Sequence, residues 1–183
     1  MLIGLTGYAR SGKDTVANIL IKNFGFTRVA FADPIRDFCY EFNPIVSHVA
    51  NEPIHLRNLV DRDGWEEAKK MDSVRHMLQF VGVGARKIFG EDFWIEQAKK
   101  SIGDKNTVIT DVRFTNEADM IKSLGGQVWR IRRTGIDAAN DHVSETQMDG
   151  YKVDQIFLNG GSIEELEQLV KTRMRGYNSP SDN

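Results

Sequence analysis

The segment from Gly7 to Thr15 contains the residue types best suited to hold a chain of phosphates. Gly7, Gly12 and Lys13 have the spacing G-x-x-x-x-G-K, directly after a short apolar run and before a helix-period segment. The glycines let successive backbone N–H groups point into one cavity, the helix N-terminus adds partial positive charge, and Lys13 supplies a full charge. We therefore predict a nucleoside triphosphate site at Gly7, Arg10, Ser11, Gly12, Lys13, Asp14 and Thr15. The competing interpretation is a glycine-rich turn with an exposed lysine.

Asp14 stands where such a phosphate-binding loop, or P-loop, usually has the Ser or Thr that meets Mg²⁺, and Thr15 follows one step later. A carboxylate beside a triphosphate is repelled unless a divalent cation lies between them. We therefore expect Mg²⁺, held by Asp14 directly, by Asp14 through water, or by Thr15. The alternative is that Asp14 only stabilises the N-terminus of the following helix.

A second carboxylate, Asp111, follows the apolar run Val108–Thr110, and Arg113 comes two residues later. An acid at the carboxyl end of a neighbouring strand can order the waters of the metal, so Asp111 is our second candidate metal residue. Arg113 can reach a phosphate from the same strand end. The alternative is that Asp111 and Arg113 pair with each other in a surface loop.

A predicted helix from Ser73 to about Gly82 carries Arg75 and Gln79. Because these residues are four positions apart, they share one face of the helix, and this face is opposite its apolar stripe. Arg86 lies about 20° from Arg75 around the axis if the helix continues past its glycines. Two guanidiniums flanking an amide suit a phosphate beside a base edge. Solvated surface residues are the competing interpretation, as they are for Arg36.

Arg130, Arg132 and Arg133 stand at the end of another predicted strand and open a polar loop, a possible lid over about residues 133–150. Arginine there could stabilise a transferring phosphoryl group or stack on an adenine. It could also simply face solvent at the strand edge.

Five apolar, β-branched runs alternate with helix-period segments, which predicts an α/β fold with a mainly parallel sheet. The predicted strands are 2–6, 28–32, 107–110, 127–131 and 153–158. Helices are predicted over 14–23 and over 115–124, the second ended by Gly125-Gly126. Another helix is capped by Asp33 and turns Ile35, Phe38 and Phe42 inward. The last is opened by the capping box of Ser162 and Glu165.

The stretch from about 43 to 103 contains no predicted strand. Its helices are expected over 73–82, with Val74, Met77, Leu78 and Val81 as the buried stripe, and over about 92–101. A helical insert on a parallel sheet usually forms a wall of a substrate cleft, although a packing appendage is the simpler interpretation.

The composition sets the broad class of the protein. The chain has 183 residues, 40% of them hydrophobic, which is enough for one core and favours one domain with an insert. The net charge of −2 lacks the positive excess of a nucleic-acid-binding chain. Cys39, the only cysteine, excludes an internal disulfide. No apolar run reaches the ~18 residues that span a bilayer, and charges come too early for a signal peptide, so we expect a cytoplasmic protein without membrane partners.

The chain resembles the phage-type deoxynucleoside monophosphate kinases of the P-loop kinase superfamily. The matching stretches span nearly its full length: Arg10–Thr15, Phe31–Arg36, Ser73–Gln79, Asp92–Trp94, Asp111–Arg113 and Leu158–Ser162. The form G-K-D-T is similar to the loop of that family. The resemblance implies a short parallel sheet with helices on both faces, ATP on the P-loop with Asn159 near its base, and a deoxynucleotide held by the helical insert. It also implies the host cytoplasm if a phage encodes the protein.

The expected reaction is ATP + dNMP giving ADP + dNDP with Mg²⁺, by a monomer or a homodimer. Lys13, Arg75, Arg113 and Asp111 would be the catalytic residues, and Arg132 would join the ATP site. Asp33, Arg36, Arg75, Gln79 and Arg86 would contact the acceptor. One alternative is a kinase with a hydroxyl acceptor, similar to dephospho-CoA kinase, in which Asp33 takes the proton. Another is a regulator that binds nucleotide without catalysis.

Overall fold

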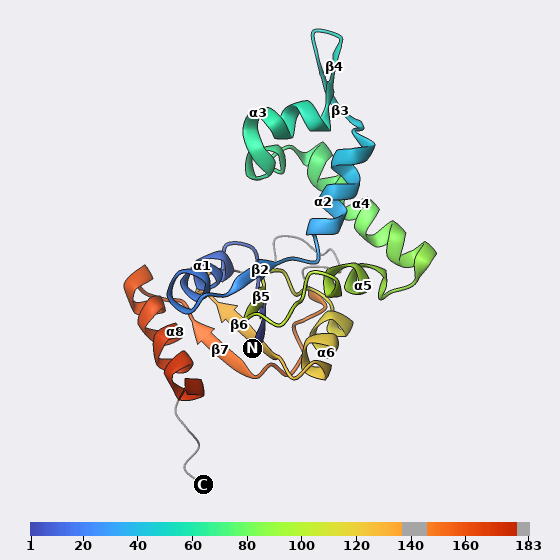
Figure 1. The fold of residues 1–183 in the computed structure, drawn as a ribbon. Coiled ribbons are helices and arrows are strands. Elements are labelled where there is room, and N and C mark those ends of the chain that lie inside the picture. The colour runs from blue at the N-terminus through green and yellow to red at the C-terminus, as the bar shows by residue number, and fades with distance from the viewer. Residues whose placement is uncertain (137–145, 179–183) are drawn as a thin grey trace. The chain divides into compact units, whose positions relative to one another are not determined.

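The computed structural model describes residues 1–136 and 146–178, and the chain separates into two compact units. The sheet unit comprises Met1–Ala30 and Ser101–Asn183, and the inserted unit comprises Phe31–Lys100. Figure 1 shows the inserted unit, from α2 to α5, as its own group of elements between β2 and β5 in the chain. None of the helices in the described ranges combines the length and the apolar composition that crossing a membrane requires.

The sheet unit contains a five-stranded sheet in the order β2-β5-β1-β6-β7, with every pairing parallel. Its strands are β1 (Leu2–Thr6), β2 (Thr27–Val29), β5 (Thr107–Ile109), β6 (Gln127–Arg132) and β7 (Gln155–Leu158). The chain starts in the middle of the sheet and adds strands to either side. The carboxyl ends of β1, β5 and β6 therefore meet at one edge, where ligands of open parallel sheets usually bind.

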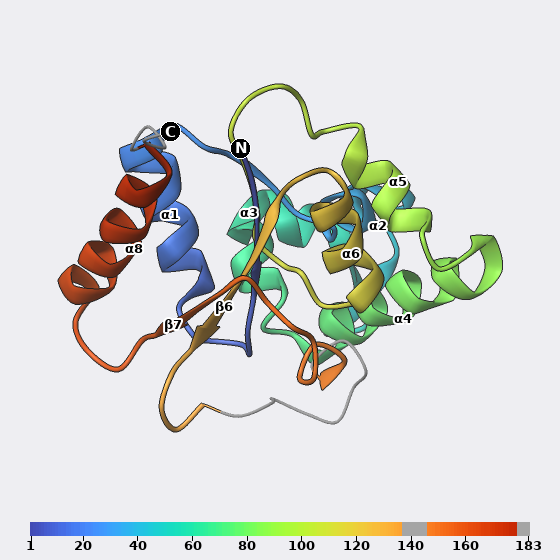
Figure 2. The same cartoon turned by 90° about the horizontal axis from the view of Figure 1, so that it is seen from below.

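Helices cover both faces of this sheet, as Figure 2 shows, with α1 (Lys13–Phe24) and α8 (Ile163–Asn178) on one side and α6 (Thr115–Ser123) on the other. All five residues of β1 are buried. Ile3 and Leu5 join the core under α1 and α8, whereas a Cβ at Gly4 would lie 2.4 Å from the Ile121 side chain of α6. The alternation of side chains along β1 thus seats one helix layer on each face.

The predicted α/β fold is confirmed, and all five predicted strands are present. The reciprocal capping of α8 is confirmed too, because the Ser162 N–H donates to Glu165 and the Glu165 N–H donates to the Ser162 hydroxyl. The strand predicted over 28–32 occupies Thr27–Val29 instead, because the chain turns into α2 (Asp33–Phe42) immediately afterwards. The N-cap of α2 is Ala32, not Asp33, and Asp33 opens the first turn.

The inserted unit is not wholly helical, so the prediction of no strand there is wrong. β3 (Ile45–Val49) and β4 (Glu52–His55) form an antiparallel hairpin, followed by α3 (Leu56–Ala68), α4 (Asp72–Phe89) and α5 (Phe93–Lys99). The hairpin turns at Ala50 and Asn51, whose φ angles are 51° and 68°. A two-residue hairpin turn with positive φ at both residues is normally signalled by Asn-Gly, Asp-Gly or Gly-Gly, and none of these pairs occurs here.

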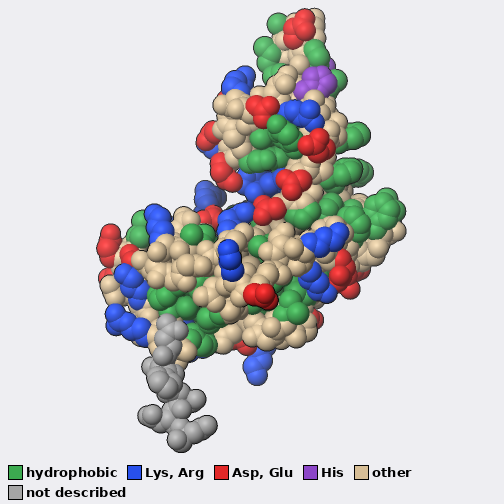
Figure 3. All heavy atoms as spheres, viewed as in Figure 1, with side chains coloured by type: hydrophobic (Ala, Val, Ile, Leu, Met, Phe, Trp, Pro, Cys, Tyr) green, Lys and Arg blue, Asp and Glu red, His purple; other side chains and the backbone are tan. Residues whose placement is uncertain are grey.

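Two expectations about helix faces are also corrected. Phe38 and Phe42 do not point inward: they are 55% and 73% exposed and stack on each other, while Cys39 is the residue of α2 that is buried. The helix expected to end near Gly82 continues to Phe89. A Cβ at Gly82 would lie 3.2 Å from the Ile35 side chain of α2. Gly82 therefore serves close packing of α4 on α2. Figure 3 shows the hydrophobic side chains that remain at the surface around α4.

The core of the inserted unit follows the predicted stripe of α4. Val74 is fully buried, and Met77, Leu78 and Val81 pack against the cluster that it forms with Cys39 and residues of α3. Burial raises the pKa of the Cys39 thiol from 9.0 to about 11, because the thiolate would lose its hydration there.

Candidate active site

A cavity of about 270 Å³ opens at the carboxyl edge of β1, β5 and β6, wholly within the sheet unit. Its walls come from the P-loop, from the ends of β5 and β6, and from the turn at Met148 and Asp149. Of the residues predicted for the site, it brings together Gly7, Ser11, Lys13, Asp111, Arg113 and Arg132. The pocket therefore combines a lysine, two carboxylates and arginines from four separate chain segments.

The glycines of the P-loop are required by its backbone. Gly7 has φ 139° and Gly12 has φ 106°, a region that side chains rarely adopt. A Cβ at Gly7 would lie 2.3 Å from the Ile131 carbonyl oxygen, and one at Gly12 would lie 2.4 Å from Asn159 Nδ2. Both positions thus exclude larger residues by conformation and by space.

Lys13 and Ser11 are polar residues of this loop whose side chains belong to the pocket wall. The Lys13 ammonium donates to the carbonyls of Gly7, at 2.7 Å, and Tyr8, at 2.8 Å. Ser11 is 1% exposed, and its hydroxyl has no hydrogen-bond partner among the described residues. A buried hydroxyl usually has a partner, so an unpartnered one in a pocket indicates a place for a ligand oxygen.

The end of β5 places Asp111, half-buried, and Arg113, exposed, in the pocket wall. The segment is fixed by Glu117, whose buried carboxylate accepts the N–H groups of Arg113, at 2.7 Å, and Phe114, at 3.0 Å. Sequence reasoning missed Glu117, although a glutamate at the third position of a helix is a known capping signal. These two hydrogen bonds from the backbone to Glu117 hold the end of the Asp111–Arg113 segment in place.

The residues present fit a Mg²⁺ ion. This ion usually takes one or two carboxylates together with phosphate oxygens and water, and Asp111 offers one carboxylate in the pocket. Asp14 is exposed and Thr15 half-buried at the start of α1, and neither belongs to the pocket wall. The described residues contain no group of three acidic, histidine or cysteine side chains that could hold a metal by themselves.

The other predicted nucleotide contacts lie around the loop. Arg132 and Arg133 are exposed in the pocket wall, whereas Arg10 is exposed outside it with φ 62°. Asn159, after β7, donates its side-chain amide to the Ser11 carbonyl at 2.9 Å and lies against Gly12. Asn159 thus supports the P-loop backbone. Half of the predicted lid, residues 137–145, lies outside the described residues.

The residues predicted to contact the acceptor all belong to the inserted unit. The Asp33 and Arg36 side chains form an ion pair at 3.4 Å, and Arg75 pairs with Asp72. Arg86 is 10% exposed and lies 3.6 Å from Glu91, on the same continuous helix as Arg75 and half-buried Gln79. The five residues therefore lie in one unit, and Arg36, Arg75 and Arg86 each have an acidic partner within five residues along the chain.

The pocket wall also contains Arg130, for which a phosphoryl, adenine or solvent-facing role was open, and Tyr8 and Asp149, which were not among the predicted site residues. Arg130 is buried, so the solvent-facing interpretation is wrong for it, and it donates to three backbone carbonyls of the turn 148–151. Tyr8 donates its hydroxyl to Asp149 Oδ1 at 2.8 Å. No local pattern could have revealed these contacts, because the partners are 18 to 141 residues apart.

Comparisons with known proteins point to one family. A family model described as deoxynucleotide monophosphate kinase matches residues 1–71 and 51–170. A protein of Acanthamoeba polyphaga mimivirus, provisionally named a deoxynucleotide monophosphate kinase, is 34% identical over 93% of this chain and 94% of its own. The deoxynucleotide monophosphate kinase of Escherichia phage RB69 is 21% identical over 95% and 99%.

Among solved structures, shikimate kinase from Aquifex aeolicus vf5 aligns with a TM-score of 0.51 and 13% identity, covering 97% of this chain and 98% of that one. At that identity the likeness shows the fold alone. It confirms the predicted P-loop kinase fold.

Proposed function

The chain belongs to the deoxynucleotide monophosphate kinase family and is a nucleoside monophosphate kinase, and from that premise we propose its reaction. The γ-phosphoryl group of ATP is transferred to the phosphate of a deoxynucleoside monophosphate, giving ADP and a deoxynucleoside diphosphate. The observation that carries this proposal is the P-loop pocket, with Lys13, the unpartnered Ser11 hydroxyl and Asp111 in one wall.

The acceptor is already an anionic phosphate oxygen, so no general base is needed. Catalysis then consists of holding two polyanions in line and stabilising charge on the moving phosphoryl group. Lys13 would exchange the Gly7 and Tyr8 carbonyls for phosphate oxygens, which is favourable because a charge-assisted bond to an anion is stronger than one to a neutral carbonyl. Ser11 would donate its hydroxyl to another oxygen of the same tail.

Asp111 would hold Mg²⁺ through its carboxylate, with Asp14 or Thr15 as the residue on the α1 side. When bound, the ion would neutralise charge on the β- and γ-phosphates. Arg113 and Arg132, in the same wall, would neutralise the remaining charge of the donor and of the transferred group. The Glu117 contacts to Arg113 and Phe114 would keep this wall in place.

The inserted unit would supply the acceptor site. Arg75 would hold the acceptor phosphate, with Arg36 and Arg86 as further guanidiniums and Gln79 near the base. Asp33 would orient Arg36 through their ion pair. Because arginine forks match phosphate oxygens in pairs, an incoming phosphate can replace Asp72 as the partner of Arg75.

The test is ADP formation from ATP and Mg²⁺ with each of the common deoxynucleoside monophosphates. We expect turnover with at least one of them, and a loss of turnover in Lys13→Met but not in Lys22→Met, an exposed lysine on the same helix. A chain that binds ATP yet phosphorylates none of the panel would contradict the proposal.

Asp33→Asn separates this reaction from transfer to a hydroxyl acceptor. If Asp33 only orients Arg36, the variant should weaken turnover several-fold, since the amide keeps an acceptor oxygen for the Arg36 guanidinium. If Asp33 removes a proton from a hydroxyl, the variant should be inactive.

A further inference from the structure

We propose that Arg130 is a positioning residue for the P-loop: its guanidinium holds the turn 148–151, and Asp149 of that turn holds Tyr8. The proposal rests on the function above only in taking ATP as the ligand of the pocket. It concerns a residue at the end of β6 that makes no predicted contact with the acceptor.

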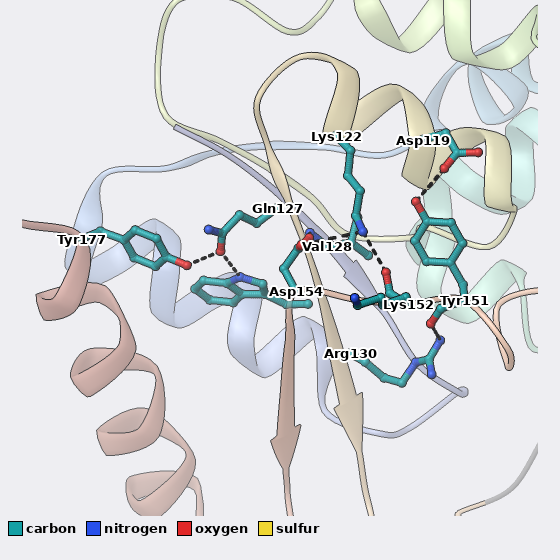
Figure 4. Close-up of polar contacts among 10 residues, drawn as sticks. Asp119, Lys122, Gln127, Val128, Arg130, Tyr151, Lys152, Asp154 and Tyr177 are labelled. Atoms are coloured by element: carbon teal, nitrogen blue, oxygen red, sulfur yellow. Dashed lines mark hydrogen bonds and ion pairs between the residues drawn. The ribbon is translucent and has the colours of Figure 1, made fainter.

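The first observation is the burial of an arginine whose guanidinium donates, among the described residues, to backbone carbonyls. Arg130 is 8% exposed, and its guanidinium donates to the carbonyls of Met148, of Asp149 at 3.3 Å and of Tyr151 at 3.2 Å. Figure 4 shows the guanidinium of Arg130 reaching the backbone of Tyr151. Burial of a charge is costly unless its donors find acceptors, and here one turn supplies three carbonyl acceptors.

The cost of this burial appears in the proton affinity of the side chain. Desolvation, with the nearby charge of Arg132 acting in the same direction, lowers the pKa of the Arg130 guanidinium. The group nevertheless remains charged at neutral pH, since arginine is effectively always protonated in proteins. Arg130 therefore adds positive charge to the pocket wall as well as holding the turn.

The second observation links that turn to the P-loop. Asp149 Oδ1 accepts the Tyr8 hydroxyl at 2.8 Å, and the Tyr8 carbonyl accepts the Lys13 ammonium at 2.8 Å. Arg130, Asp149, Tyr8 and Lys13 all belong to the wall of one pocket. A shift of the turn would thus reach the residue that we expect to bind the triphosphate.

The same turn has a second anchor, outside the pocket, against which the effect of the Arg130 anchor can be compared. Tyr151 donates its hydroxyl to Asp119 of α6 at 2.7 Å, and the Lys122 ammonium lies 5.0 Å from the centre of the Tyr151 ring. Lys122 also donates to the Lys152 carbonyl at 2.7 Å. Figure 4 shows Asp119 and Lys122 reaching from α6 toward Tyr151 and Lys152. Asp119, Lys122 and Tyr151 are absent from the pocket wall.

Four variants separate positioning from plain stability. Arg130→Lys keeps the charge but cannot donate in a fork, Arg130→Gln removes the charge, and Tyr8→Phe removes only the hydroxyl that meets Asp149. Tyr151→Phe breaks the outer anchor and leaves the pocket wall intact. The measurements are the dissociation constant for a non-hydrolysable ATP analogue without acceptor, the KM values for ATP and for the monophosphate, kcat, and thermal unfolding.

We expect Tyr8→Phe to weaken analogue binding about 5-fold, Arg130→Lys about 10-fold and Arg130→Gln about 100-fold. The KM for the monophosphate should stay within 2-fold in each. Tyr151→Phe should lower the unfolding temperature and weaken analogue binding less than Tyr8→Phe does, because Arg130 still holds the turn. The Tyr8→Phe/Arg130→Lys double variant should lose less affinity than the product of the single losses, because both act through Asp149.

Analogue binding within 2-fold of the parent in both Tyr8→Phe and Arg130→Lys would overturn the proposal, and so would fully multiplicative losses in the double variant. Tyr8→Phe keeps the test valid if an Arg130 variant fails to fold. Failure of the kinase proposal is separable: it would appear as absent turnover in a parent chain that still binds the analogue, and the affinity ratios would still decide the role of Arg130.

Discussion

The sheet unit and the inserted unit hold their charged residues in opposite ways. In the sheet unit, Lys13 and Arg130 are held by backbone carbonyls of their surroundings. In the inserted unit, Arg36 and Arg75 pair with acidic side chains three residues away on their own helices. Hydrogen bonds to the backbone fix the position of a side chain before a ligand arrives, whereas ion pairs within reach of water stabilise little and exchange readily. The proposed donor pocket is thus built in advance, and the groups proposed for the acceptor can exchange their partners.

The largest effect should come from a change in the P-loop pocket of the sheet unit. Lys13→Met is expected to lower kcat/KM by about 10³-fold, because it removes the mobile charge from the transferring phosphoryl group. The rate of ADP formation in a coupled assay measures it, with Lys22→Met as the matched control. Thermal unfolding should be unchanged, and retention of a tenth or more of the activity would contradict a preformed donor site.

Arg75→Ala tests the inserted unit, where the arginines pair with exchangeable acidic partners. We expect kcat/KM for the monophosphate to fall on the order of 10- to 100-fold with the KM for ATP unchanged, because a bond to a charged group is worth about 1.5–3 kcal/mol. Arg62→Ala, an exposed arginine paired with its neighbour Asp63, is the control and should change neither constant. Equal effects of the two variants would show that Arg75 is only a surface residue.

Asn159→Ala tests whether the donor loop depends on support from another segment. The variant loses the bond to the Ser11 carbonyl, so we expect the KM for ATP to rise about 5-fold, equivalent to about 1 kcal/mol. The KM for the monophosphate should not move. Asn18→Ala, an exposed residue on α1, is the control. An increase in both KM values would contradict a role of Asn159 limited to the ATP site.

The smallest effect concerns the core of the inserted unit. The folded protein keeps the Cys39 thiol protonated up to its pKa of about 11, whereas the unfolded chain releases the proton near the ordinary 9.0. The stability due to this group is therefore complete below pH 9 and is lost as the pH rises toward 11. Urea unfolding at pH 8 and pH 10 should show a steeper loss for the parent than for Cys39→Ala. Parallel losses would contradict a buried thiol.

The sheet unit was largely predictable because its signals are local. The runs that form β1 and β6 alternate with helix-period segments, and the spacing of Gly7, Gly12 and Lys13 identifies the loop at the end of β1. The parallel pairing then follows from the βα connections. Asp111 could be proposed because it follows a buried strand that must end at the same edge.

The inserted unit and the supporting contacts were less predictable. The hairpin turns on Ala50 and Asn51, which carry no usual turn signal, and α2 buries Cys39 rather than its larger phenylalanines. Arg130 was assigned a phosphoryl or surface role because its partners lie in a turn about 20 residues further on. Such contacts depend on tertiary structure, so a one-dimensional pattern does not contain them.

The most direct measurement is calorimetric titration of ATP with Mg²⁺ into the parent chain and into Lys13→Ala, with no acceptor present. A donor site built in advance predicts one ATP per chain for the parent and a loss of binding of about 100-fold or more for the variant. Equal affinity in the two proteins, or no binding to the parent, would contradict it.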